Sequence, residues 1–284
     1  MTFRIKFAKY GVVRFIGHLD VMRYFQKVIR RSRLPVSYSQ GFSPHQLMSF
    51  ALPLSVGVTS DGEYMEVEFD DEALQRSAGV SADPEGSNSS SGTEASETDP
   101  KEAEKLEKYI FDGLAANTTE GFAVLGVKML PKPKPNTHQD KAMALVSAAD
   151  YLIRVKDGYE ESVGFSTQDD LYSAFERFMA RETIEVTKKT KKNENQLNLK
   201  EYIYRYTNGD DADAAGIAHA RKFGSGMQLM MRLAAGSKVN IKPDLVLEAF
   251  LNSIGREFDK NAFAIHRMEL FMGEKDELKP LIEC

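Results

Sequence analysis

The sequence predicts an α+β protein built from two tandem ferredoxin-like units, each with the element order βαββαβ. A chain of 284 residues is long enough for about two domains. Short segments with apolar residues at every second position alternate with longer segments whose apolar residues recur every three or four positions. This order of segments occurs twice, on either side of the proline-rich connector PKPKP at 131–135.

The first unit is expected over residues 1–130. Alternating apolar residues predict a strand over 3–7, and an apolar stripe at helical spacing predicts a helix over 20–33. A strand interrupted at Pro53 is expected over 47–58, and Gly62 is expected to mark a turn. The remaining elements of this unit are a strand at 64–69, a helix at 101–116 and a strand at 122–130.

The second unit is expected over residues 148–284, after a linker at 131–147. Its expected elements are strands at 151–155, 183–187, 202–207, 227–233 and 263–272 and helices at 166–181 and 243–254, which adds one hairpin to the first unit's plan. Ser166 and Asp169 have the spacing of a capping box. Residues 79–100 are rich in Ser, Gly and acids and poor in apolar residues, so we expect a disordered insertion there.

Composition excludes several classes of protein. No apolar run reaches the roughly 20 residues of a membrane helix, and the first residues lack a signal-peptide core, so a cytoplasmic protein without a membrane partner is expected. Cys284 is the one cysteine, which leaves no disulfide and no cysteine set for zinc or an iron-sulfur cluster. The five histidines are scattered, so no metal and no cofactor is expected in this chain.

The charge is unevenly distributed along the chain. The first fifty residues hold nine Lys or Arg against the single acid Asp20, whereas the whole chain has a net charge of -5. Such an asymmetry predicts a segment that meets a polyanion. The candidate surface for nucleic acid or a partner is the basic helix and its two flanking loops, with His18, Arg23, Lys27, Arg30, Arg31, Arg33, Tyr38, Gln40, Gly41, Phe42 and His45.

A structural interpretation stands beside each functional one. Basic residues on a helix can simply be its solvated face. Arg4 and Lys6 are expected to face Glu66 and Glu68 across the first sheet, which is an ordinary structural use of charge. A second basic run, with Lys188, Lys189, Lys191 and Lys192, is expected at a hairpin tip, where it can contact phosphate or only protect the edge.

Three residues are weak catalytic candidates. His18 can act as a general base, because an ordinary histidine titrates near neutral pH, and Asp20 can orient it. The competing interpretation is that both serve the start of the helix by capping it and by complementing its dipole. His45, after Pro44, can bind a ligand or only hydrogen-bond within its loop.

Residues 15–69 combine a His-Leu-Asp helix start, the basic helix, the loop QGFSPH at 40–45 and the run LPLSVG at 52–57, in that order. This combination resembles the bacterial family of radical SAM-associated proteins, also called radical SAM-linked proteins. The resemblance extends over nearly the whole chain, with the Pro-Lys linker and PDLVLE at 243–248 as later landmarks, while the insertion at 79–100 departs from the family's shorter loop.

The resemblance implies a partner rather than a reaction. Members of that family occur beside, or fused to, a radical S-adenosylmethionine protein, their own activity is unassigned, and their gene surroundings imply RNA metabolism by association. S-adenosylmethionine and an iron-sulfur cluster are therefore expected only in a partner protein.

Three hypotheses follow from the residues together with the resemblance. The first is a non-catalytic RNA-binding accessory partner of a radical SAM enzyme. The second is an RNA endonuclease similar to the nucleases that process CRISPR repeats, and the third is a protein adaptor without RNA binding. The sequence leaves the oligomeric state open.

Overall fold

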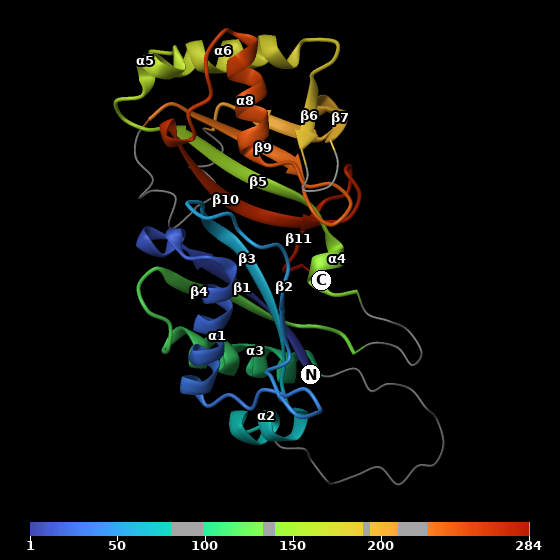
Figure 1. Cartoon of the computed structure of the whole chain (residues 1–284). Coiled ribbons are helices and arrows are strands. Elements are labelled where there is room, and N and C mark those ends of the chain that lie inside the picture. The colour runs from blue at the N-terminus through green and yellow to red at the C-terminus, as the bar shows by residue number, and fades with distance from the viewer. Residues whose placement is uncertain (81–98, 133–139, 190–193, 210–225, 284) are drawn as a thin grey trace. The chain divides into compact units, whose positions relative to one another are not determined.

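The computed structural model describes residues 1–80, 99–132, 140–189, 194–209 and 226–283. The chain divides into two compact units: unit 1 comprises Met1–Val56, Glu63–Ala144 and Ile282–Cys284, and unit 2 comprises Gly57–Gly62 and Leu145–Leu281. Both contain helices and mainly antiparallel strands, so the expected α+β class is confirmed (Figure 1). Most of the expected insertion at 79–100 and the centre of the linker at 131–147 lie outside the described residues.

Unit 1 has the expected order of strands and long helices, with three short helical segments added. Its elements are β1 (Thr2–Lys9), η1 (Gly11–Phe15), α1 (His18–Ser32), β2 (Met48–Phe50), β3 (Thr59–Glu68), α2 (Asp71–Ala78), α3 (Pro100–Ala115), β4 (Phe122–Met129) and the start of α4 (Ala142–Leu145). The strands lie in the order β4-β1-β3, with β2 paired to β3. Apart from η1, α2 and α4, the order of these elements is βαββαβ, as in a ferredoxin-like unit.

The alternation of β1 explains the core of unit 1. Phe3, Ile5 and Phe7 point to one face of the sheet and are fully buried. The apolar stripe of α1 covers that face, with Phe25 4.5 Å from Phe7 between ring centroids. Leu106 of α3 belongs to the same cluster, so both helices cover the face that β1 dictates.

The helix α1 ends where its sequence predicts. Arg33 adopts a left-handed conformation with φ of 56°, and its N–H donates to the carbonyl of Arg30. Leu34-Pro35 follows and prevents continuation. At the start, Gly17 is the N-cap and no side chain caps the helix, so the capping role expected for His18 and Asp20 is wrong. Asp20 does lie in the first turn, where its charge complements the helix dipole as expected.

A buried ion pair lies on the opposite face of the same sheet. Arg4 and Glu66 are almost fully buried, and Arg4 Nη2 donates to Glu66 Oε1 at 2.8 Å. The second carboxylate oxygen accepts the N–H of Ala142 at 3.1 Å. The expected pairing of Arg4 with Glu66 is thus confirmed, whereas the Lys6 ammonium lies 5.9 Å from the ring centroid of Tyr64.

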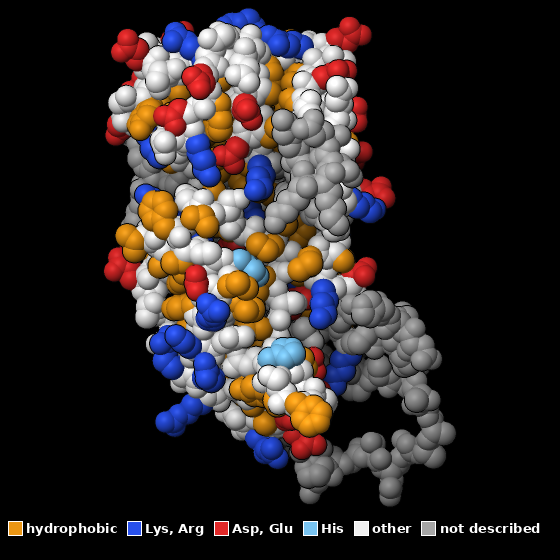
Figure 2. Space-filling model, in the orientation of Figure 1, with side chains coloured by type: hydrophobic (Ala, Val, Ile, Leu, Met, Phe, Trp, Pro, Cys, Tyr) orange, Lys and Arg blue, Asp and Glu red, His pale blue; other side chains and the backbone are white. Residues whose placement is uncertain are grey.

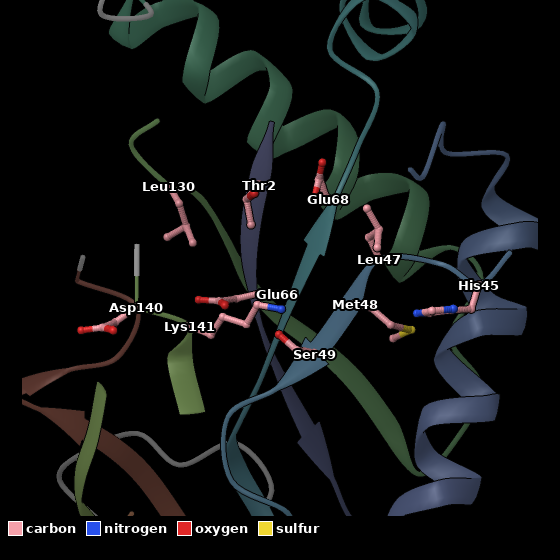
Figure 3. A pocket seen from close by; sticks show the side chains of 10 residues that line it. All are labelled: Thr2, His45, Leu47, Met48, Ser49, Glu66, Glu68, Leu130, Asp140 and Lys141. Atoms are coloured by element: carbon pink, nitrogen blue, oxygen red, sulfur yellow. The ribbon is translucent and has the colours of Figure 1, made fainter. Parts of the chain in front are cut away.

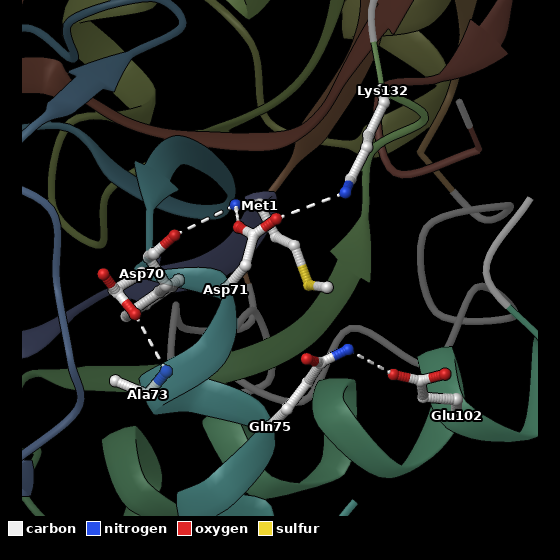
Figure 4. Close-up of polar contacts among 8 residues, drawn as sticks. Met1, Asp70, Asp71, Ala73, Gln75, Glu102 and Lys132 are labelled. Atoms are coloured by element: carbon white, nitrogen blue, oxygen red, sulfur yellow. Dashed lines mark hydrogen bonds and ion pairs between the residues drawn. The ribbon is translucent and has the colours of Figure 1, made fainter. Parts of the chain in front are cut away.

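The helix α2 escaped sequence analysis, although its start carries a clear capping signal. Asp70 Oδ1 accepts the N–H of Ala73, as Figure 4 shows. Asp71 binds the Met1 ammonium and Lys132, the latter at 3.2 Å, and so ties α2 to the start of β1 (Figure 4). Partial burial raises the pKa of Asp71, but these two cations outweigh it and hold the pKa below its ordinary 3.8.

Unit 2 repeats the plan with an additional hairpin. Its elements are β5 (Val146–Val155), α5 (Glu160–Val163), α6 (Gln168–Met179), β6 (Glu185–Lys189), β7 (Glu194–Asn198), η2 (Leu199–Glu201), β8 (Ile203–Thr207), β9 (Gln228–Ala234), α8 (Pro243–Ser253), η4 (Lys260–Ala262), β10 (Phe263–Met272) and β11 (Lys279–Pro280). The strands lie in the order β10-β5-β9-β8, while β6 and β7 form the added hairpin. The first residues of β3 pair in parallel with β10 at Thr59 and Ser60.

An arginine and a carboxylate also pair across the sheet of unit 2. Arg232 of β9 donates to both carboxylate oxygens of Asp150 on β5 at 2.7 Å. Its guanidinium also lies 4.1 Å from the ring centroid of Phe271. The hydrogen bonds to Asp150 raise the pKa of Arg232 above its ordinary value.

Three local predictions are wrong. Gly62 lies inside β3 and not in a turn. A Cβ at this position would lie 2.6 Å from the Glu269 backbone, so glycine is needed here for a close approach of two backbone segments. The strand expected over 47–58 is only three residues long, β2. The N-cap of α6 is Thr167, whose hydroxyl accepts the N–H of Asp170, one residue after the expected capping box.

We predict that Arg4→Met destabilises the protein by about 3–5 kcal/mol, because it leaves the Glu66 carboxylate buried without its cation. The free energy of unfolding, measured in urea by circular dichroism, checks this. Lys128→Met is the matched control. Lys128 lies opposite Arg4 in the pairing of β4 with β1, but its side chain is 47 % exposed and pairs with Glu107. We therefore expect its replacement to change the free energy of unfolding by less than about 1 kcal/mol. Equal effects of the two substitutions would contradict the prediction.

We predict that the contribution of Asp71 to stability depends on pH. Its folded pKa lies below 3.8, so the contribution is present above that value and is lost as the pH falls through the folded pKa. The difference in unfolding free energy between the parent and Asp71→Asn should therefore be constant near neutral pH and shrink below 3.8. A difference that stays constant down to the acid limit of the folded state would refute this.

Candidate nucleic-acid interface

The exposed face of α1 carries a stripe of cations. Arg23, Lys27 and Arg30 are exposed and recur at spacings of four and three, so their side chains leave the helix on one side. Figure 2 shows Lys and Arg side chains gathered over α1. The burial of the opposite, apolar stripe determines this orientation, because the helix cannot rotate without exposing Phe25.

The cations of this stripe have few internal partners. Arg23 Nη1 lies 3.2 Å from Asp20 Oδ1, in a pair whose side chains are 66 % and 59 % exposed, so the pair contributes little. Arg30 Nε donates to the carbonyl of Gln26 at 3.3 Å. Among the described residues Lys27 has no hydrogen bond or ion pair. The stripe therefore keeps its positive charge available to solvent.

Two other arginines of the predicted surface differ from the stripe. Arg31 is exposed, but its guanidinium donates to the carbonyl of Asn117 at 2.7 Å and so joins α1 to the segment before β4. Arg33 is the left-handed residue at the end of the helix and is exposed. Arg31 thus has a structural role that the sequence did not reveal.

The loop after α1 is closed at its base. The N–H of Ser39 donates to the carbonyl of His45 at 2.9 Å, and the Ser39 hydroxyl lies 2.8 Å from His45 Nδ1. The N–H of His45 also donates to that hydroxyl, at 3.1 Å. An isolated bridge between Tyr38 and Gln46 lies directly outside this base. These contacts define a compact loop, residues 38–45, which we call the aromatic loop.

The tip of the aromatic loop presents an aromatic side chain to solvent. Gly41 has a φ of 118°, which permits the sharp turn there. Phe42 follows it and is fully exposed, and Tyr38 at the base is 47 % exposed. Gln40 is also exposed. A fully exposed phenylalanine gains nothing from folding, so its position favours contact with another molecule.

A hydrogen bond from Gln46, the residue directly after the aromatic loop, joins this segment to the basic helix. Gln46 Nε2 donates to the carbonyl of Gln26 in α1 at 3.4 Å. Gln46 is buried although it is polar, which places the loop base against the side of the helix. The structure thus brings together two segments that sequence analysis grouped only because they are close in the chain.

The weak catalytic candidates do not form a catalytic group. His18 packs against the edge of Phe50, with ring centroids 5.1 Å apart. No hydrogen bond among the described residues joins His18 to Asp20, which pairs with Arg23 instead. His45 is held by Ser39. Each of these residues lies in unit 1, but none is oriented by another.

His45 also lines a polar cavity of about 230 Å³ in unit 1. Figure 3 shows its ring beside Met48, and the carboxylates of Glu66 and Glu68 further along the cavity. The cavity is also lined by Thr2, Leu47, Ser49, Leu130, Asp140 and Lys141. Sequence analysis missed this cavity, because its walls come from β1, β2, β3 and the segment before α4. The described residues contain no group of three or more His, Cys, Asp or Glu able to hold a metal ion.

The second basic run lies in unit 2. Lys188 and Lys189 end β6 and pair with Asn195 and Glu194 of β7, as expected for a run beside a hairpin turn. Lys191 and Lys192 lie outside the described residues.

Sequence analysis also missed an exposed apolar group at the start of α1. Val12, Phe15 and Leu19 are 83 %, 60 % and 59 % exposed. The Arg14 guanidinium lies 4.7 Å from the ring centroid of Phe15. Val12 and Phe15 belong to the 3-10 helix η1, in which no residue is buried, and Leu19 lies in the first turn of α1.

Comparison with known proteins shows the family of the chain. The model of a family described as an uncharacterised protein conserved in bacteria, DUF2344, matches residues 2–108 and 86–243. The chain belongs to this family. The match covers α1 and the aromatic loop, so the candidate interface lies within the family's shared region. A search of curated proteins finds no match.

Within the described part of the chain, no helix combines the length and the apolar character needed to cross a membrane.

Proposed function

We propose that this protein binds single-stranded RNA through α1 and the aromatic loop, as an accessory partner of a radical SAM enzyme. The observation that carries the RNA proposal is the placement of an exposed cationic stripe, Arg23, Lys27 and Arg30, beside a loop whose tip exposes Phe42. Guanidinium and ammonium groups bind phosphate oxygens, and an exposed aromatic ring stacks on an unpaired base.

The aromatic loop favours single-stranded over double-stranded RNA. In an A-form helix the bases are stacked on each other and cannot stack on a protein side chain. Phe42 therefore has a role only if bases are splayed out. A duplex would meet the cationic stripe alone.

The role beside a radical SAM enzyme rests on the resemblance of residues 15–69. A radical SAM enzyme needs three cysteines to hold its cluster, and this chain has Cys284 alone. Any radical step would therefore occur in another polypeptide, and the part proposed for this chain is to hold the RNA.

Cleavage of RNA by this chain has less support. General base catalysis requires a histidine placed and oriented for proton transfer. His18 packs on Phe50, His45 is bonded to Ser39, and neither is hydrogen-bonded to a carboxylate among the described residues. The geometry favours binding.

We predict that replacing Arg23, Lys27 and Arg30 together with alanine weakens binding to a fluorescein-labelled single-stranded oligoribonucleotide. Each phosphate contact contributes about 0.7 to the slope of log K against log salt concentration, so the slope should fall by about 2. Fluorescence anisotropy at several salt concentrations measures this. Phe42→Ala should cost about 1–3 kcal/mol in binding to the single strand and little in binding to a duplex.

The matched control replaces three exposed lysines of unit 2, Lys238, Lys242 and Lys260, with alanine. It makes the same change in net charge but leaves α1 intact, and we expect its salt slope to match the parent. If both triple variants lower the slope equally, binding is non-specific charge attraction and the proposed interface is wrong.

The enzyme partner is tested by purifying the native protein with its bound molecules. We predict that an iron-sulfur protein that binds S-adenosylmethionine co-purifies, identified by mass spectrometry and by iron content. Nuclease treatment distinguishes association through RNA from direct contact between the two proteins. Loss of the complex after treatment shows that RNA joins the proteins, and retention of the complex shows a direct protein contact. Absence of such a protein from purifications made without nuclease would contradict the partnership.

A further inference from the structure

Unit 2 contains a groove that the RNA-binding proposal does not use. It has a volume of about 460 Å³ and lies between β6 and α8. One side is lined by five consecutive residues, 183–187, which are the first three residues of β6 and the two residues before it. The helix forms the other side, with Leu245, Glu248, Ala249, Asn252 and Ser253. Figure 1 shows the hairpin of β6 and β7 beside α8.

The wall formed by β6 is a free strand edge. In the described part of the chain, β6 pairs with β7 alone. Successive side chains of a strand point to opposite faces, so a cavity over one face would be lined by alternate residues. Here consecutive residues line it, which places the groove along the edge opposite β7.

The hydrogen bonds of the hairpin show which backbone groups face this groove. The carbonyl of Ile184 accepts the N–H of Leu199, and the N–H of Ile184 donates to Asn198 Oδ1, so both groups of Ile184 point towards β7. In an antiparallel pair this direction alternates along the strand. The N–H and C=O groups of Glu185 and Thr187 therefore point into the groove.

The side chains of the groove divide into apolar ones that form its floor and charged ones at its rim. Ile184 and Val186 turn inward with Phe178 and Leu245, whereas Glu185 is exposed. Glu248 of α8 is a second exposed carboxylate in the groove, while Arg181 is occupied by the carbonyl of Ser253 at 3.2 Å. The groove thus offers strand hydrogen bonds, an apolar floor and an acidic rim, in which the carboxylates of Glu185 and Glu248 outnumber the guanidinium of Arg181.

We propose that this groove binds an extended segment of a partner protein by strand addition to β6. The segment would alternate apolar side chains, which meet the floor, with at least one lysine or arginine, which meets Glu185 and Glu248. Because α8 forms the opposite wall of the same groove, the space suits one strand. The sheet edge of a second copy would bring its own β7 and is the less fitting occupant.

A synthetic peptide tests the backbone geometry directly. The probe is a fluorescein-labelled TVKVTVK peptide, and two further versions carry N-methyl groups on one or the other set of alternate amides. Only one set of amides in an added strand donates to β6. We expect one methylated version to lose binding by about tenfold or more and the other to bind like the parent.

Two proline variants test the protein side. Thr187→Pro removes an N–H that faces the groove, and we expect peptide binding to weaken by about tenfold. Gln196→Pro is the matched control: Gln196 lies opposite Thr187 in the hairpin, and its N–H faces the outer edge of β7. Its affinity for the peptide should equal that of the parent protein.

A charge reversal tests the rim. Glu185→Lys should weaken binding of the basic peptide, whereas Glu182→Lys, an exposed change outside the groove, should not. Thermal unfolding shows whether each variant is folded. If Thr187→Pro does not fold, the methylated peptides still test strand addition to β6 on the parent protein.

The proposal is overturned if the parent peptide does not bind, or if both methylated peptides bind equally. It is also overturned if sedimentation shows a dimer that Thr187→Pro abolishes, because the occupant would then be a second copy. None of these outcomes depends on RNA binding by α1, so the two proposals can fail separately.

Discussion

The packing of α1 on the sheet of unit 1 is the constraint on which the candidate interface depends. Phe25 lies against Phe7, and Tyr24 stacks on Phe122 with centroids 4.3 Å apart. These contacts prevent rotation of the helix, so its cations face solvent. Their direction is therefore a consequence of hydrophobic burial. Arg31 extends the same restraint through its hydrogen bond to Asn117.

Unit 1 uses its basic residues in two distinct ways. Arg4 is buried and satisfied by Glu66, where a lone charge would be costly. Arg23 and Lys27 remain in water, where charge costs little and is available to a polyanion. Only part of the positive charge of the first fifty residues is thus exposed and available to another molecule. The aromatic loop adds to it a fully exposed ring, which charge alone does not provide.

The two units expose different kinds of binding group. Unit 1 exposes charge and an aromatic ring, which suit a flexible polyanion. Unit 2 exposes the backbone edge of β6 next to an apolar floor, which suits an extended peptide. The two proposed binding surfaces belong to separate compact units, and binding of RNA by one and of a polypeptide by the other would fit the proposed accessory role.

The sequence by itself determined the element types, the core-facing residues of β1 and α1, and the pairing of Arg4 with Glu66, because these follow from local periodicity and from charge on known strand faces. It failed for α2 and Gly62, since a weak helix and a close backbone approach depend on neighbours distant in the chain. Only the tertiary structure decided that Arg31 is partly structural and that, among the described residues, no acid orients His18 and β6 pairs with β7 alone, with its other edge facing α8. Each of these facts depends on which segments meet in space, and periodicity carries no information about that.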